Sequence, residues 1–359
     1  DLNETALHLA KVANPNCKVV GVSVNTQNMK EEEANARAIG AASGVKAHMS
    51  RGTVGGKRVV MNNQEEEITA SEMKQKYGVS PKGGDSAILP KYNNETFENF
   101  IKKNKDDVNK SAPGFGRKAI IYSTCFVNYN KKNTGIAALK VLKKNGIEVE
   151  HAYPGCCGMP FLEQAEPQKV VKQANIVSKE LNKWINKGYK VVTLTASCGL
   201  MLKFEWPLLL PKDEEIKKLS KNTIDIDEYI VDLSKKEGLM DGLKELDGGV
   251  TVHHACHARA QNMGNKARDM LKLIPNVKID IVERCAGHGG TFGLMKSTHD
   301  IANKVGKTTA NTVKRKNNKY MASDCPLAGK HIKQLAEDVN IISDEAIHPI
   351  ELIAKSYKL

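Results

Sequence analysis

Cysteine is the residue type in this sequence whose placement most clearly points to chemistry. The stretch Tyr153–Pro160 reads YPGCCGMP, so Cys156 and Cys157 are adjacent in a loop that also contains two glycines and two prolines. Neighbouring cysteines form only a strained disulfide with each other. Thiolates are strong ligands for soft metals, so two thiols on one short loop are better suited to binding a metal group.

The chain has eight cysteines among 359 residues. That number is low for a disulfide-stabilised scaffold. No secretory signal sequence is visible, and the chain begins with Asp1 instead of Met, which indicates a fragment or a processed form. We interpret Cys17 as a buried core residue and expect the other cysteines to bind metal or perform redox chemistry.

Seven of the cysteines recur in two sets with matched spacing. The first cysteines of successive loops are 31 and 42 residues apart in the first set, and 29 and 40 residues apart in the second. Matched spacings of this kind indicate an internal repeat. The first set is Cys125, Cys156, Cys157 and Cys198, and the second is Cys256, Cys285 and Cys325.

The segments before the cysteines read as strands, and amphipathic helical patterns separate them. The strand-like runs are Lys118–Thr124, Ile147–Tyr153, Lys190–Ser197, Gly249–Ala255, Lys278–Glu283 and Tyr320–Asp324. The helical patterns cover Thr134–Lys144, Pro167–Asn186, Arg259–Ile274 and Thr298–Lys314. This alternation predicts an α/β fold with two repeated βαβ cysteine-rich units and parallel sheet. Because parallel strands end at one edge, each set of cysteines should gather there.

The N-terminal part lacks the regular alternation of strands and helices. A strand-like run at Lys18–Val24 and a helical pattern at Lys30–Ile39 predict a small α/β segment, to which we assign no role. A tract rich in Gly, Pro and Asn follows and reads as a linker. The predicted organisation is an N-terminal segment at 1–80, a linker at 81–116, a first repeat at 117–245 and a second repeat at 246–359.

The first set supplies four thiolates, enough for a [4Fe–4S] cluster or a tetrahedral zinc ion. Structural zinc sites usually use C-x-x-C pairs, which these loops lack. The adjacency of Cys156 and Cys157 suits a cluster of several irons better than a single ion, so iron–sulfur is favoured. Gly158 follows directly and is predicted to let the backbone approach the cofactor.

The second set is less complete, because Arg284 precedes Cys285 where the first repeat has its doubled cysteine. Its three thiols predict a second metal or substrate site, holding an iron–sulfur cluster, a zinc ion or no metal. Four histidines lie nearby in sequence and could complete a zinc site. These are His253, His254, His257 and His288.

His257 and Arg259, in ACHAR, are the candidate catalytic residues. His257 is placed to act as a ligand or as a proton carrier. Arg259, together with Arg284, would offset the negative charge of a thiolate-bound cluster. In CAGHGGTFG, the glycines Gly289 and Gly290 are expected to let the backbone approach a cofactor.

The chain has 54 Lys and Arg residues against 41 Asp and Glu, a formal net charge of +13. The basic residues are mostly lysines interleaved with acids, whereas nucleic-acid-binding proteins usually concentrate arginine and aromatic residues on one face. We predict no nucleic-acid partner and a lysine-rich solvated surface, with an acidic partner protein as the alternative. The apolar runs are too short for a membrane span. The predicted location is cytoplasmic, with peripheral docking on the inner membrane face as the alternative.

Six motifs in this frame resemble the cysteine-rich CCG domain family. The resemblance covers about Pro90–Leu359, and the family includes a subunit of heterodisulfide reductase, the iron–sulfur subunit of glycolate oxidase, the lactate-utilisation oxidoreductases and a subunit of anaerobic glycerol-3-phosphate dehydrogenase. The motifs are STCFVNYN at 123–130, YPGCCGMP at 153–160, SCGLMLKFEWP at 197–207, HHACHARAQNMG at 253–264, ERCAGHGGTFG at 283–293 and SDCPLAG at 323–329.

The resemblance implies an electron-transfer oxidoreductase subunit with iron–sulfur clusters. Its partners would be a flavin dehydrogenase or ferredoxin-type protein on one side and a quinone or disulfide acceptor on the other, including a membrane quinone pool. Thr195 and Ala322 stand where the full family motif has further cysteines. The five-cysteine cluster of the heterodisulfide reductases is therefore not expected. No ferredoxin-type cysteine motif precedes the repeats, so electrons would arrive from a missing N-terminal portion or a separate protein.

Two alternatives come from other classes of protein. The chain could be a zinc-binding scaffold of a dehydrogenase complex without redox activity, which would be colourless and destabilised by chelators. It could also be a thiol–disulfide enzyme using Cys156 and Cys157, although adjacent cysteines form strained rings.

Overall fold

The computed structural model describes residues 49–54, 57–61, 65–68, 93–104, 108–290, 292–293, 298–336 and 347–359. The predicted strand at Lys18–Val24 and helix at Lys30–Ile39, together with Cys17, lie outside the described residues. The chain divides into two compact units. Unit 1 comprises Asp1–Leu89, Gly158–Lys172 and Gly290–Ile301, and unit 2 comprises Pro90–Cys157, Gln173–Gly289 and Ala302–Leu359.

Unit 1 contains an antiparallel three-stranded sheet of order β1-β2-β3. The strands are β1 (Met49–Val54), β2 (Lys57–Met61) and β3 (Glu65–Ile68). These strands were not predicted, because glycines and an acidic run interrupt the alternation of apolar and polar residues that marks a half-buried strand. The short helix α7 (Met159–Leu162) also belongs to unit 1.

Unit 2 holds both predicted parallel sheets. The first sheet has the order β5-β4-β6-β7, and the second has the order β10-β8-β9. In each, the first strand of the repeat is central and its next two strands flank it, so the α/β repeat is confirmed. The strands are β4 (Lys118–Tyr122), β5 (Glu148–Ala152), β6 (Lys190–Thr193), β7 (Thr223–Asp225), β8 (Val250–His253), β9 (Ile279–Val282) and β10 (Tyr320–Ser323).

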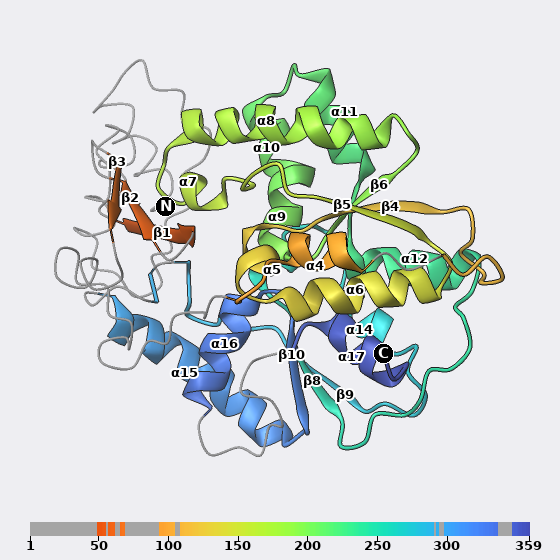
Figure 1. The fold of residues 1–359 in the computed structure, drawn as a ribbon. Coiled ribbons are helices and arrows are strands. Elements are labelled where there is room, and N and C mark those ends of the chain that lie inside the picture. The colour runs from red at the N-terminus through yellow and green to blue at the C-terminus, as the bar shows by residue number, and fades with distance from the viewer. Residues whose placement is uncertain are drawn as a thin grey trace. The chain divides into compact units, whose positions relative to one another are not determined.

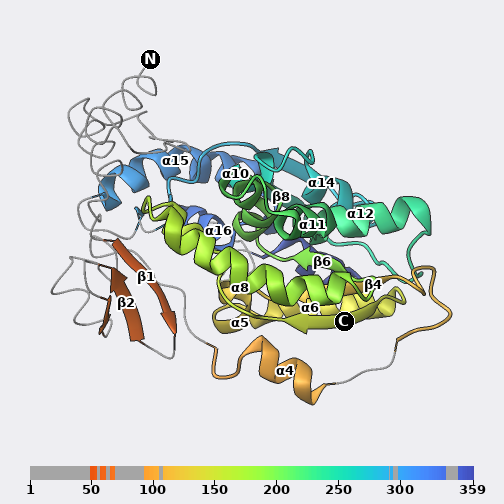
Figure 2. The ribbon, with the colours of Figure 1, turned by 90° about the horizontal axis from the view of Figure 1, so that it is seen from above.

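Helices cover both faces of each sheet, as the fully buried strands β8 and β10 and the largely buried strand β4 require. Figure 2 shows α8 and α11 lying over the first sheet. The helix α4 (Phe97–Lys103) precedes the first repeat, whose helices are α5 (Cys125–Tyr129), α6 (Lys132–Lys144), α8 (Pro167–Ile185), α9 (Ala196–Leu200), the π-helix η1 (Met201–Glu205), α10 (Trp206–Leu209), α11 (Glu214–Asn222) and α12 (Ile226–Lys236). In the second they are α13 (Cys256–Arg259), α14 (Lys266–Leu271), α15 (His299–Lys316), α16 (Pro326–Leu335) and α17 (Pro349–Ser356).

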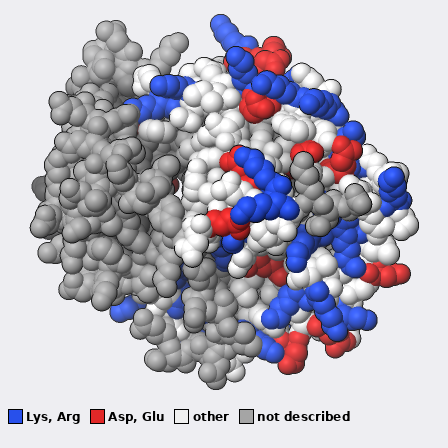
Figure 3. Space-filling model, in the orientation of Figure 1, with Lys and Arg blue, Asp and Glu red and all other residues white. Residues whose placement is uncertain are grey.

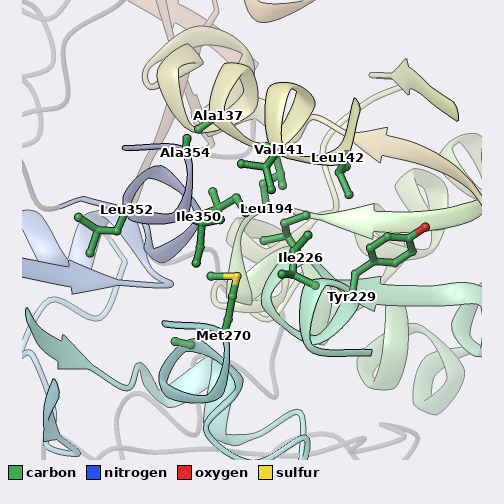
Figure 4. Packing of buried hydrophobic residues seen from close by; sticks show 14 of the residues in the cluster. Ala137, Val141, Leu142, Leu194, Ile226, Tyr229, Met270, Ile350, Leu352 and Ala354 are labelled. Atoms are coloured by element: carbon green, nitrogen blue, oxygen red, sulfur yellow. The ribbon is translucent and has the colours of Figure 1, made fainter. Parts of the chain in front are cut away.

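The main hydrophobic core joins the two repeats. Helices α6 and α12 pack on the first sheet, α14 and α17 lie toward the second, and the four helices contact one another between the sheets (Figure 1). Figure 4 shows Val141 of α6, Ile226 of α12, Met270 of α14 and Ile350 of α17 pointing into this layer. Burying apolar surface from both halves in one core stabilises them together.

Two segments differ from their predicted form. The helix expected over Arg259–Ile274 is interrupted, because Asn262 and Gly264 adopt φ angles of 53° and 73° that end a right-handed helix. The segment expected as a linker contains α4, whose Phe97 is fully buried against the core. Among the described helices, none is both long and apolar enough to cross a membrane.

Candidate functional site

Each of the seven described cysteines lies just after a strand of unit 2. Cys125 begins α5 after β4, Cys198 lies in α9 after β6, and the doubled cysteine follows β5. In the second repeat, Cys256 begins α13 after β8. Cys285 follows β9, and Cys325 caps α16 after β10. The strand ends therefore bring both sets of cysteines to sheet edges, as parallel topology requires.

The thiols of the first set contact one another in a row. Cys125 is hydrogen-bonded to Cys156, Cys156 to Cys157, and Cys157 to Cys198. Cys157 and Cys198 are buried, whereas Cys125 and Cys156 are half-buried. We call these four residues the first thiol group.

The first thiol group fits a thiolate-bound cofactor. The hydrogen bond to Cys156, followed by burial, raises the pKa of Cys125 well above its usual range, and hydrogen bonds from Cys156 and Cys198 do the same for Cys157. Ionising one thiol is unfavourable because the resulting negative charge would lie beside the other sulfurs. A bound metal cation offsets that charge and displaces the protons. In the described part of the chain, no three His, Cys, Asp or Glu side chains converge to hold one metal ion.

Two buried aromatic residues hold the loop of the doubled cysteine. The Tyr122 hydroxyl donates to the Gly155 carbonyl at 2.7 Å, and the Trp206 indole Nε1 donates to the Cys157 carbonyl at 3.0 Å. Trp206 follows directly after the π-helix η1, a rare geometry that often marks functional sites. The next residue of the loop, Gly158, has φ 83°, which only glycine adopts easily. The sequence contains these residues in its motifs but does not indicate these supporting contacts.

Tyr122→Phe should loosen this loop. The substitution leaves the half-buried Gly155 carbonyl without its donor, so the free energy of unfolding should fall by about 1 kcal/mol. Tyr357→Phe is the matched control, because the Tyr357 hydroxyl donates to the Met240 carbonyl, also at 2.7 Å, and neither residue belongs to a cysteine loop. Urea denaturation should show similar losses in both variants. Only Tyr122→Phe should also lower the iron content, and equal iron in both would contradict the role of this contact.

The second thiol group, Cys256, Cys285 and Cys325, is asymmetric. Cys256 is exposed, and it accepts hydrogen bonds from the Cys285 thiol and from Arg259 Nη2, the latter at 3.4 Å. These contacts lower the pKa of Cys256 to about 5. The same thiol–thiol hydrogen bond and burial raise the pKa of Cys285, and burial raises that of Cys325 to about 11. Cys256 is thus the exposed member of the group, and Cys285 and Cys325 are half-buried beside it.

Three of the four nearby histidines have structural contacts. Both ring nitrogens of His253 are hydrogen-bonded, to Ser323 Oγ and to the Arg284 carbonyl, each at 3.0 Å. His254 Nδ1 contacts Glu283 at 3.1 Å. His288 packs edge-on against His331, and burial lowers its pKa to about 3. These rings are engaged in holding the fold.

His257 lies in α13 directly after Cys256 and is partly buried, which lowers its pKa. Its assignment as a ligand or proton carrier stays a prediction.

The glycines after Cys285 have packing roles. A Cβ on Gly287 would lie 2.2 Å from the Ala302 carbonyl oxygen of α15, and one on Gly290 would lie 2.5 Å from a carboxylate oxygen of Glu163. Gly289, with φ 49°, serves the same turn.

Ala196 links the two thiol groups. Its amide donates to the Asp324 carbonyl at 3.3 Å, and its own carbonyl accepts from Gln261 Nε2 at 3.0 Å. Asp324 precedes Cys325, Gln261 follows α13, and Ala196 is two residues before Cys198. Ala196 also packs in a small apolar cluster with Ala255 and Ala258, and Cys325 packs against that cluster. The sequence offers no signal for this link, because alanine and glutamine have no distinctive pattern.

Gln261→Met tests this link, because it keeps the side-chain volume but removes the donor to the Ala196 carbonyl. We expect the free energy of unfolding to fall by about 1 kcal/mol. Gln261→Glu should cost more, since it buries a carboxylate that cannot donate when ionised. Chemical denaturation of both variants measures the difference. A Gln261→Met protein as stable as wild type would show that the contact contributes nothing.

Comparison with known proteins agrees with this architecture. The family model for the cysteine-rich domain (CCG) matches the chain twice, over residues 119–203 and 250–333. Lactate utilization protein A of a Geobacillus species is 31% identical over 50% of this chain and 76% of its own length. This chain belongs to the cysteine-rich CCG domain family. The two matched segments begin in β4 and at β8, so each contains one thiol group and the three strands that precede its cysteines, while β7 of the first sheet lies beyond the first match.

Other relatives carry further information in their names. An uncharacterized iron–sulfur protein of Methanococcus maripaludis is 31% identical over 60% of this chain and 41% of its own length. A subunit of the anaerobic glycerol-3-phosphate dehydrogenase of Escherichia coli is 24% identical over 75% of this chain and 65% of its own length. The CCG chain spans about half the length of the first curated relatives that it matches.

A buried trio of carboxyl groups lies between the two CCG domains. Asp225 ends β7 and caps α12, Asp227 lies in the first turn of α12, and Asp324 precedes Cys325; all are at most 2% exposed. Asp227 and Asp324 are in hydrogen-bond contact, which requires a proton on one of them, and Asp227 has no donor of its own. Burial raises the pKa of Asp225 to about 7 and that of Asp324 to about 6. Sequence reasoning missed this trio.

Proposed function

We propose that this chain is the iron–sulfur subunit of a dehydrogenase or reductase complex and transfers electrons within it. The observation that supports this most strongly is the first thiol group. Four thiols from three separate strand ends are hydrogen-bonded in a row, and two of them are buried. A purely structural core has no use for four thiols in contact, whereas a site for a soft metal group requires them.

In this proposal Cys125, Cys156, Cys157 and Cys198 would hold a [4Fe–4S] cluster. When bound, such a cluster accepts and donates one electron at a time. The chain itself supplies a rigid, largely dry environment. Trp206 fixes the doubled-cysteine loop, and the apolar burial of Cys157 and Cys198 excludes water from the sulfurs.

The second thiol group is not assigned a cluster here. It lacks one thiol, and Cys256 is exposed, whereas the first group is a continuous row with two buried members. Metal binding by Cys256, Cys285 and Cys325 stays a prediction of the sequence, as does the zinc scaffold without redox activity.

The partners follow from the relatives' names and from the surface. Relatives named as a dehydrogenase component and as iron–sulfur proteins support a flavin dehydrogenase or ferredoxin-type donor, with a quinone or a disulfide as acceptor. Figure 3 shows Lys and Arg interleaved with Asp and Glu over the described part of one face, without a single basic stripe. That distribution fits docking to a protein better than binding along nucleic acid.

Anaerobic purification followed by iron, acid-labile sulfide and zinc analysis tests the proposal. We expect iron and sulfide in about equal amounts, a brown colour, and an EPR signal on reduction typical of a [4Fe–4S] cluster. A protein that stays colourless and iron-free after reconstitution would overturn it. Zinc bound in place of iron would support the scaffold instead.

A further inference from the structure

Helix α15 carries basic residues without an interleaved acid over most of its length. The segment 301–319 contains six Lys or Arg residues and no Asp or Glu. In α11, by contrast, Lys217 pairs with Glu214 at 2.7 Å, and in α12 Lys236 pairs with Asp232 at 2.9 Å. Opposite charges one turn apart stabilise a helix, and α15 does without them from residue 301 onward.

The basic side chains of α15 project from one side of the helix. Ala310 and Val313 are buried in an apolar cluster with residues of β9 and β10. Lys304, Lys307 and Arg315 are exposed. With about 3.6 residues per turn, these exposed positions lie on the side opposite to the buried ones. The apolar side of α15 is therefore used in the fold, and its outer side is basic.

Most of this positive charge is not neutralised within the protein. Lys316 pairs with Asp280 at 2.9 Å, and Lys319 pairs with Asp247 at 3.4 Å. In the part of the chain that the structure describes, the other four basic residues of the segment have no Asp or Glu within ion-pair distance. We call these four the α15 basic face: Lys304, Lys307, Lys314 and Arg315. Like charges on one face repel one another, so an acidic ligand there would be stabilising.

The inner side of the same helix packs directly against a cysteine loop. Thr309 Oγ1 donates to the Cys285 carbonyl at 2.6 Å. Gly306 approaches the same loop so closely that a Cβ on it would lie 2.6 Å from the Ala286 carbonyl oxygen. A protein seated on the outer side of α15 would thus be separated from the Cys285 loop by one helix, about 10 Å across.

We propose that the α15 basic face is the docking surface for an acidic electron-carrier protein. The proposal rests on the proposed function, which requires such a partner, and it adds the surface and the charge of the occupant. A cluster of Asp and Glu side chains on the partner would face the lysines of α15. Complementary charge of this kind speeds the encounter and orients the two proteins, so that the carrier approaches the cysteine loops from a fixed side.

Two other anionic surfaces fit this face less well. Nucleic-acid-binding proteins concentrate arginine and aromatic residues on the contact face, whereas segment 301–319 contains one arginine and no Phe, Trp or Tyr. A helix that lies on a membrane buries its apolar side among the lipids. The apolar side of α15 is already buried in the protein.

Calorimetric titration of the anaerobically purified chain with an acidic plant-type [2Fe–2S] ferredoxin tests the proposal. Binding should be detectable at about 10 mM salt and weaker at about 150 mM. Replacing both Lys304→Glu and Lys307→Glu should weaken binding at low salt by about tenfold or more. The double replacement Lys217→Glu and Lys221→Glu on α11 is the matched control, because it changes the net charge equally on a helix with interleaved acids, and it should bind like wild type.

Three results would overturn the proposal. These are a wild-type chain that does not bind the ferredoxin at low salt, equal affinity in the two double variants, and a loss in the α15 variant of binding to anionic vesicles or duplex DNA but not to ferredoxin. Circular dichroism and iron content should be the same in all variants, since the replaced lysines are on the surface. The titration needs no iron in the protein, so an iron-free chain that still binds through α15 would contradict only the proposed function.

Discussion

Cys198→Ser should lose most of its iron when purified anaerobically beside wild type. Serine offers a harder and more basic oxygen, which binds iron less well than a thiolate. No other ligand can readily replace the lost thiol. The hydrogen bond of Ala196 fixes α9 in place, and Cys198 contacts Cys157 in the buried part of the row. We expect the cluster affinity to fall by about tenfold or more, with a matching loss of sulfide and EPR intensity.

Cys285→Ser is the control for this experiment, because it removes a thiol of the second group and leaves the first group intact. Circular dichroism should show that both variants are folded, since a serine replaces a cysteine of nearly equal volume. If Cys198→Ser keeps its full iron content while remaining folded, the first thiol group is not the cluster site. Equal iron loss in both variants would mean that the two groups share one cofactor.

Asp227→Asn should make the protein more stable at pH 8. Burial, together with the charges of Asp324 and Asp225, raises the pKa of Asp227 well above its usual range. A carboxyl group whose pKa is raised by folding stabilises the folded state at low pH, and that contribution is lost as pH rises through the folded pKa. For Asp324 and Asp225 those values are about 6 and about 7, against 3.8 for a free side chain. The trio should therefore destabilise the protein increasingly between about pH 4 and pH 7.

An asparagine at position 227 stays neutral and can donate to Asp324, so it removes this loss. We expect a gain on the order of 2 kcal/mol in the free energy of unfolding at pH 8, and a smaller gain at pH 5. Asp232→Asn is the matched control on the same helix, because its ion pairs with Arg117 and Lys236 lower its pKa. It should lose a little stability at pH 8. Urea denaturation at both pH values decides, and an Asp227→Asn protein that is less stable than wild type at pH 8 would contradict this reading of the trio.

The strand ends and the cysteine frame could be predicted because they depend on local sequence. Each strand-like run preceded a cysteine loop, and all six runs are strands with ends shifted by a few residues. Parallel topology then dictates which edge the cysteines share. The first thiol group follows from that rule, because the loops after β4, β5 and β6 all lie at the same edge of one sheet.

The contacts that join the two repeats could not be predicted, because they depend on packing between distant segments. Asp227 reads as an ordinary acidic residue in the first turn of a helix, and only the fold shows it buried against Asp324. Strand β7 is three residues long, too short for a periodic pattern. The break after α13 depends on the left-handed conformation of Asn262. Asparagine also occurs inside helices, so its presence in the sequence does not by itself predict that conformation.

The double hydrogen bond of Ala196 has a consequence for how this protein can vary. One half of the chain supplies a backbone position before Cys198, and the other half supplies both of its partners, Gln261 and the Asp324 carbonyl. A second domain transplanted from a relative would bring its own residues to those two places. Such a hybrid should be less stable where the residue equivalent to Gln261 no longer donates, so exchanging the two halves together should preserve stability best.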